Sequence, residues 1–175
     1  MQQRFFSTKR ICLIAVFIAL TVVLSMVSNL RIGNYIEISF KFIPVFVMGA
    51  LFGPVLSGLT SLLGDVVTVM MFTGGAPLIG LFVTEFVSGF IYGVLFYNNY
   101  EKSVSYIVRM VICVLLQFAL SLFVNSYILY SAGYFSTFAV AIGIRFWASF
   151  SKIFMHAAVI IFAPYYLKVF SKLIY

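Results

Sequence analysis

The chain of 175 residues is 64% hydrophobic and only 9% charged, and its mean hydropathy is +1.17. A soluble domain carries about 25% charged residues, so this composition excludes a soluble globular protein and predicts an integral membrane protein. In a soluble domain, the formal net charge of +7 would suggest binding to nucleic acid. Here the basic residues stand at the ends of apolar runs, where they indicate the orientation of the protein in the membrane. No nucleic-acid partner is therefore expected.

Four apolar spans are predicted in the first part of the chain. The first lacks charge and is long enough to cross a bilayer, which takes about 20 helical residues. The second is short and ends at Gly53-Pro54, and the third is closed by the turn sequence "TGGAP". The predicted spans cover about residues 11–29, 40–52, 55–71 and 78–97.

Two further spans are predicted after residue 97, at about 104–130 and 145–170, with an outer loop around "YSAGYFST". The expected fold is an all-α integral membrane protein, a compact bundle of six transmembrane helices forming one domain over residues 1–175. Six spans place both termini on one side of the membrane.

The positive-inside rule makes that side cytoplasmic. It would carry Arg4, Lys9, Arg10, Lys102, Lys168 and Lys172, whereas the opposite side would carry Arg31, Lys41 and Arg145. If spans two and three were one broken helix, the C-terminus would instead lie outside.

The chain lacks the residues that catalysis needs. It has four carboxylates and one histidine, and it contains no H-E-x-x-H, G-x-S-x-G or C-x-x-C motif and no Gly-Lys of a phosphate-binding loop. Cys12 and Cys113 lie in apolar runs and are interpreted as packing residues. We therefore expect no enzyme activity, no ATP hydrolysis by this chain, no catalytic residues, no metal and no cofactor.

Several ionisable residues fall at membrane depth: Asp65, Glu85, Arg109, Lys152 and His156. A central Asp, Lys or Arg costs about 2.5–3.5 kcal/mol on insertion scales, so each needs a partner, a wet cavity or a function. Snorkelling accounts for Arg109. Lys152 and His156 are four residues apart and share a helix face, with Arg145 two turns earlier on the same side. This pattern predicts an inward-facing basic strip, in which His156 is either a hydrogen-bonded interior residue or a proton relay.

Aromatic residues make up 19% of the chain, and many flank the predicted outer loops. Phe40 and Trp147 are examples. Most such residues anchor a protein at the membrane interface, but beside Arg31, Arg145 and Glu85 some could form stacking walls for a flat heteroaromatic ligand. Ala15 and Ala19 have the four-residue spacing that lets helices approach closely, either within this bundle or against a partner protein.

The segment "RIGNYIEISFKFIPVFVMGALFGPVLSGLTSLLGD", followed by "GLFVTEFVSGFIYG" at residues 80–93, resembles the substrate-binding S components of energy-coupling factor vitamin transporters, and most closely their folate-type branch. The resemblance covers residues 9–97 by motif and the remainder only by its pattern of spans. Two positions depart from the family pattern. Phe82 stands where threonine is usual, and Glu85 where a small residue is usual.

The resemblance implies a vitamin-binding subunit in a prokaryotic cell membrane, which captures its substrate at the outer face under the loop between spans one and two. A transmembrane T component and two cytoplasmic ATPases would drive import, and Ala15 and Ala19 would contact the T component. The predicted substrate-binding residues are Arg31, Phe40, Glu85, Tyr92, Arg145, Trp147, Lys152 and His156. The predicted structural or gating residues are Pro44, Gly53, Pro54 and Asp65.

Folate is the favoured ligand. Its flat pterin suits aromatic stacking, its donor and acceptor edge suits Glu85, and its anionic glutamate tail suits Arg31, Arg145 or Lys152. Three alternatives stay open: an S component for another vitamin such as pantothenate, a small proton-coupled secondary transporter that uses Glu85 and His156, and a structural or assembly membrane protein.

Overall fold

A computed structural model of the chain describes residues 8–27, 30–32, 36–38, 40–73, 78–98 and 104–174. Most of these residues are helical. In chain order the elements are α1 (Thr8–Val27), β1 (Leu30–Ile32), β2 (Ile36–Ile38), α2 (Phe42–Phe52), α3 (Pro54–Thr68), the π-helical turn η1 (Val69–Thr73), α4 (Ile79–Phe96), α5 (Val104–Ala119), the π-helical turn η2 (Leu120–Val124), α6 (Asn125–Ser131) and α7 (Phe138–Ile174).

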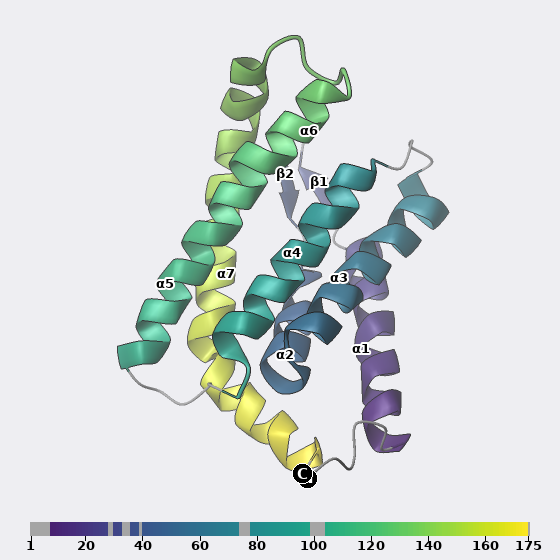
Figure 1. Ribbon diagram of the computed structural model, residues 1–175, viewed down its shortest axis with the longest axis vertical. Coiled ribbons are helices and arrows are strands. Elements are labelled where there is room, and N and C mark those ends of the chain that lie inside the picture. Colours follow the sequence, from purple (N-terminus) through teal and green to yellow (C-terminus); the bar gives the residue numbers. More distant parts are fainter. Residues whose placement is uncertain are drawn as a thin grey trace.

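The helices form rods that run alternately up and down (Figure 1). One rod consists of α3 and η1, and another of α5, η2 and α6. Among the described residues, three helical segments are long and apolar enough to cross a membrane, namely Pro54–Met71, Ile79–Phe96 and Val104–Ser131. α7 adds a fourth if its two parts, which bend by 47° between Trp147 and Lys152, are taken as one span. The described chain is therefore a helical membrane protein.

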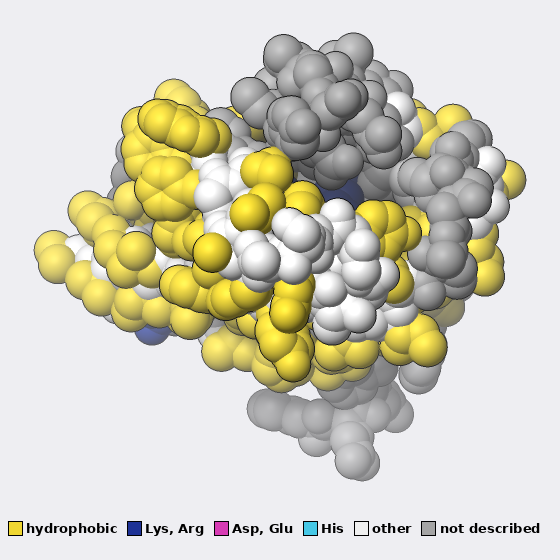
Figure 2. All heavy atoms as spheres, turned by 90° about the horizontal axis from the view of Figure 1, so that it is seen from above, with side chains coloured by type: hydrophobic (Ala, Val, Ile, Leu, Met, Phe, Trp, Pro, Cys, Tyr) yellow, Lys and Arg dark blue, Asp and Glu magenta, His cyan; other side chains and the backbone are white. Residues whose placement is uncertain are grey.

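α1 begins and α7 ends toward the same end of the molecule, the bottom of Figure 1, while α6 lies at the other end. Figure 2 looks onto the end that carries α6, where hydrophobic side chains lie beside a patch of polar side chains and backbone. The hydrophobic surface continues along the rods, because many of the exposed side chains are large and apolar, as expected for contact with lipid.

The antiparallel pair β1–β2 is a feature that the all-α prediction did not contain. Arg31 pairs with Glu37, and Leu30 and Ile32 pair with Ile38 and Ile36. Three residues that include Gly33 separate the strands in sequence, and a separation of three to five residues containing glycine is a hairpin signal. The pair joins α1 to α2, where the sequence analysis expected only a loop.

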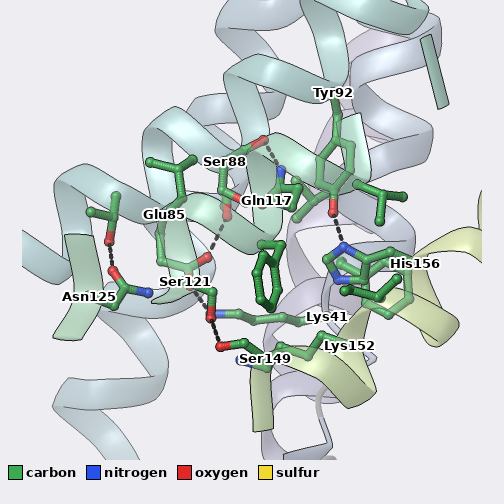
Figure 3. Close-up of a pocket in the computed structure, with 18 residues that line it drawn as sticks. Lys41, Glu85, Ser88, Tyr92, Gln117, Ser121, Asn125, Ser149, Lys152 and His156 are labelled. Carbon is green, nitrogen blue, oxygen red and sulfur yellow. Dashed lines mark hydrogen bonds and ion pairs between the residues drawn. The ribbon is translucent and has the colours of Figure 1, made fainter. Parts of the chain in front are cut away.

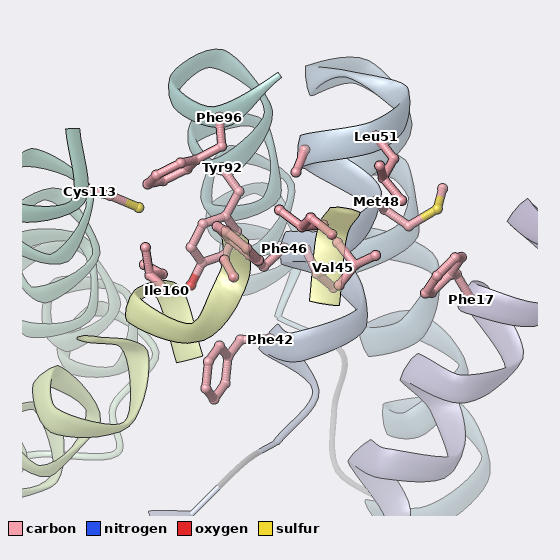
Figure 4. Packing of buried hydrophobic residues seen from close by; sticks show 14 of the residues in the cluster. Phe17, Phe42, Val45, Phe46, Met48, Leu51, Tyr92, Phe96, Cys113 and Ile160 are labelled. Carbon is pink, nitrogen blue, oxygen red and sulfur yellow. The ribbon is translucent and has the colours of Figure 1, made fainter. Parts of the chain in front are cut away.

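α2 lies at the centre of the fold rather than at its surface. Nearly every residue of this helix is buried, which explains its unbroken apolar sequence. Figure 4 shows Phe46 of α2 beside Tyr92 and Phe96 of α4, with ring-centroid separations of 5.6 and 5.1 Å. At 1.5 Å per residue, its 11 residues span about 16 Å, about half of a bilayer core. α2 is therefore a core helix around which the longer rods pack.

A sharp reversal separates α2 from α3 at the predicted Gly53-Pro54 break. Gly53 has φ +95°, a conformation that favours glycine, and Pro54 occupies the first turn of α3. α4 packs directly on this reversal: a Cβ on Gly93 would collide with the backbone of Pro54, and a Cβ on Gly89 would lie 2.5 Å from the Ser57 carbonyl oxygen. Backbone contact thus ties α2, α3 and α4 together.

Candidate functional site

A pocket lies where α2, α3 and α4 meet α5, η2, α6 and α7 (Figure 3). Its lining combines aromatic and aliphatic side chains with an unusual number of polar ones for a protein interior in a membrane. The polar lining residues are Lys41, Ser61, Thr84, Glu85, Ser88, Tyr92, Gln117, Ser121, Asn125, Ser149, Lys152 and His156.

An ion cluster occupies the side of the pocket formed by α2, α3 and α4. Lys41 Nζ lies 2.8 Å from Asp65 Oδ1 and 3.0 Å from Glu85 Oε1. Ser61 Oγ donates a hydrogen bond to Glu85 Oε2 at 3.0 Å. One ammonium group therefore serves two carboxylates, which offsets the cost of placing all three charges at membrane depth.

Hydrogen bonds between neutral side chains connect α4 to the rod formed by α5, η2 and α6. Thr84 Oγ1 donates to Asn125 Oδ1 at 2.7 Å, and Ser88 Oγ donates to Gln117 Oε1 at 2.7 Å. Gln117 Nε2 donates in turn to the Ser88 carbonyl oxygen at 3.0 Å. Because Asn125 uses its oxygen in this bond, its amide hydrogens are available to another acceptor.

Tyr92, His156 and Phe42 form an aromatic group at one side of the pocket. The Tyr92 hydroxyl lies 3.1 Å from His156 Nδ1, and the rings of Phe42 and His156 have centroids 4.2 Å apart. In the tautomer that carries its proton on Nε2, His156 accepts a hydrogen bond from Tyr92. Flat, partly polar surfaces of this kind suit an aromatic ligand.

Four of the predicted substrate-binding residues line this pocket: Glu85, Tyr92, Lys152 and His156. They come from α4 and α7, which are far apart in sequence. Asp65 is not among the lining residues, but it contacts Lys41, which is.

Other predicted binding residues lie outside the lining. The side chains of Phe40 and Trp147 are 41% and 70% exposed, respectively. Arg145 is also absent from the lining. The basic strip predicted from Arg145 to His156 assumed a straight helix, but α7 bends by 47° between Trp147 and Lys152, so Arg145 stands on the other side of the bend from Lys152 and His156.

The remaining predicted residues have structural positions. Arg31 belongs to β1, and its side chain lies outside the described part of the chain. Pro44 stands in the first turn of α2, and Gly53 and Pro54 form the reversal before α3. Ala15 and Ala19 lie on an exposed face of α1.

Sequence reasoning missed Lys41 and the neutral polar residues of the pocket. Lys41 was interpreted only as an orientation charge, although it stands in an apolar segment 24 residues before Asp65. Gln117 and Asn125 are eight residues apart in one apolar span, a spacing that places them on the same helix face. That spacing was the available signal for the amide side of the pocket.

The comparisons with known proteins agree with this geometry. Residues 9–166 match the family described as the substrate-specific component of the ECF transporter. A 64-residue segment is 45% identical to the folate transporter FolT of Clostridium novyi (strain NT), and this match spans only 37% of the chain and 37% of that relative. A crystal structure of FolT bound with folic acid superimposes with a TM-score of 0.76 and 26% identity, covering 90% of this chain and 93% of that one. Because the family match covers most of its length, the chain belongs to the substrate-specific components of ECF transporters, which are transport proteins and not an enzyme family.

Proposed function

We propose that this protein is the folate-binding subunit of an ECF-type importer. The observation that carries the proposal is the pocket of polar and aromatic side chains, found in a fold similar over 90% of the chain to a structure described as FolT bound with folic acid. The partial identity to a bacterial folate transporter supports the same ligand.

The chemistry of the pocket fits the parts of folate. The partly exposed ring of His156, which packs on the buried rings of Phe42 and Tyr92, offers a flat surface for the pterin. Glu85 offers a carboxylate to the pterin edge, while Lys152 supplies positive charge for a glutamate tail. Sites of this type are mostly apolar and use a few placed polar groups for specificity.

We further propose that the chain passes through the membrane six times, with the buried α2 as a short pass, and that both termini lie in the cytoplasm of a prokaryotic cell. The alternating course of the rods supports this topology (Figure 1). The basic residues at the two ends of the chain support the orientation. The substrate would then enter from the end that carries α6.

Import would depend on partner subunits, namely a transmembrane T component and two cytoplasmic ATPases, as the family implies. Ala15 and Ala19, which are exposed on α1, are the proposed contact with the T component. Small side chains at this spacing let two helices approach closely in lipid.

Titration calorimetry on the purified chain in detergent or nanodiscs tests the binding role. The ligands are folic acid, pantothenate, riboflavin and thiamine. We expect saturable binding of folic acid alone, together with a higher melting temperature, because a ligand that binds the folded state stabilises it.

Preference for pantothenate or another vitamin would keep the importer role but reject folate. If none of the four ligands binds or stabilises the protein, the proposal is wrong, and proton-driven transport in proteoliposomes becomes the next assay.

A further inference from the structure

Glu85 occupies an unusual position, because both of its carboxylate oxygens are held and yet the side chain still faces the pocket. Oε1 contacts Lys41 Nζ at 3.0 Å and Oε2 accepts from Ser61 at 3.0 Å. The Glu85 side chain nevertheless remains 25% exposed and lines the cavity. A residue needed only as a brace between helices would have no reason to keep this access.

Lys41 lies between two carboxylates, and Lys152 adds a second cation to the same pocket. Asp65 lies 2.8 Å from the ammonium group, so Lys41 is shared between two carboxylates and does not neutralise Glu85 alone. Removing the Asp65 carboxylate would change the distance and direction of the Lys41–Glu85 contact. Asp65 thus acts on Glu85 through Lys41.

The carboxylate of Glu85 retains the capacity to accept two more hydrogen bonds. Each carboxylate oxygen has two lone-pair sites, of which Lys41 takes one on Oε1 and Ser61 takes one on Oε2. The remaining sites lie on neighbouring oxygens, the arrangement that accepts two parallel N–H donors in a bidentate contact. A ring N–H next to an exocyclic amino group supplies such a pair.

We propose that Glu85 is a specificity-determining residue that recognises the adjacent ring N–H and amino donors of a flat heterocycle, and that Lys41 and Asp65 are positioning residues for it. This inference rests on the proposed function and extends it to a ligand class, the 2-amino-4-oxopteridines. The partly exposed ring of His156 and the amide of Asn125 line the same cavity and are available to the rest of the ring system.

The test compares folic acid with its 2-deamino analogue, which keeps the ring system and tail but lacks the amino donor. Affinities are measured by calorimetry on the purified full chain. We expect the wild-type protein to bind folic acid roughly 10- to 100-fold more tightly, since a hydrogen bond to a charged group contributes that much. In Glu85→Gln the preference should fall to about threefold or less, because one acceptor oxygen becomes a donor.

Two further variants separate recognition from general damage to the site. Asp65→Asn should lower the preference for folic acid only in part, and Asp65→Glu, which keeps a partner for Lys41, should restore it toward the wild-type ratio. Ser131→Ala removes an exposed hydroxyl at the end of α6 and is the control, for which the ratio should not change.

The outcomes are distinguishable. If the wild type binds folic acid and Glu85→Gln keeps the full preference over the deamino analogue, the inference is wrong and the proposed function stands. If the wild type binds neither compound, both are wrong. If Glu85→Gln does not fold, Glu85→Asp replaces it. Moving the carboxylate by one methylene should weaken the binding of folic acid more than the binding of its deamino analogue. Equal weakening of both would overturn the inference.

Discussion

The helices α1 to α4 and the helices α5 to α7 are held together in different ways. Within the first group, α4 touches α3 and the Gly53-Pro54 reversal backbone to backbone at Gly89 and Gly93. Between the groups, the contacts are made by side chains, such as Thr84 with Asn125 and Tyr92 with His156. The pocket lies along this second kind of boundary.

The two groups of helices therefore make different contributions to the pocket. The first group supplies a rigid wall with the ion cluster, whereas the second supplies amides, Lys152 and His156 through contacts that are easier to rearrange. Interhelical hydrogen bonds in membrane proteins contribute on average about 0.6 kcal/mol, while backbone packing cannot yield without a clash. Ligand binding at the boundary should therefore strengthen the weaker contacts.

Removing the cation of the rigid wall should have the largest effect. Lys41→Met leaves Asp65 and Glu85 close together without their shared ammonium group. Breaking a fully buried ion pair in this way costs about 3–5 kcal/mol. The three side chains here are 18–25% exposed, so the loss should be about 3 kcal/mol, at the lower end of that range, and the melting temperature in detergent should fall sharply. The triple variant Lys41→Met, Asp65→Asn, Glu85→Gln should regain much of the loss. A single variant as stable as wild type would show that the cluster does not stabilise the first group.

Adding a methyl group at Gly93, where α4 packs on the Gly53-Pro54 reversal, should have the next largest effect. A methyl group at Gly93 meets the backbone of Pro54, which cannot move aside as a flexible side chain would. Overpacking of this kind costs about 1–3 kcal/mol, so Gly93→Ala should lower the melting temperature and the yield of monodisperse protein.

Gly143→Ala in α7 is the matched control, because a Cβ there has no neighbour within 4 Å among the described residues. Alanine favours helix over glycine by about 1 kcal/mol, so this variant should be as stable as wild type or more so. Equal losses at Gly93 and Gly143 would contradict the contrast between the two groups of helices.

The same contrast explains what could be predicted from the sequence. The Gly53-Pro54 reversal and the charged residues leave strong signals, because glycine, proline and charge are conspicuous in an apolar chain. Glu85 and Asp65 were singled out for that reason, but their shared partner Lys41 was not, since pairing across 24 residues has no local pattern. No proline or glycine at residues 147–152 signals the bend in α7, so the sequence analysis placed Arg145 on one straight helix with Lys152 and His156.

Neutral polar residues were the hardest to interpret. Serine and threonine in membrane helices commonly bond to their own backbone, as Thr60 does with the Leu56 carbonyl oxygen. Ser88 looks the same in sequence, yet it bonds to Gln117 on another helix. The Thr84 hydroxyl combines both uses, because it lies within hydrogen-bond distance of the Leu81 carbonyl oxygen and of Asn125 Oδ1. Only the tertiary structure separates these two uses.

Loss of the Tyr92 hydroxyl should have a smaller effect. Tyr92→Phe keeps the buried ring that packs on Phe46 but removes the hydrogen bond to His156 between α4 and α7. The expected loss of stability is about 1 kcal/mol. If bound folic acid needs α7 in this position, the loss of stability should be larger in its presence. Thermal melting of both proteins with and without folic acid measures the two losses.

The smallest expected effect lies at the contact between Thr84 and Asn125, and it tests the boundary most directly. A double-mutant cycle with Thr84→Val and Asn125→Leu isolates their coupling energy. We expect about 0.6 kcal/mol in the absence of ligand, because each group can find other polar partners in a wet pocket. A coupling energy above about 2 kcal/mol would show that this contact is as rigid as the contacts within the first group. The pocket would then be preformed on both sides, and ligand binding would not need to draw α5 to α7 toward α4.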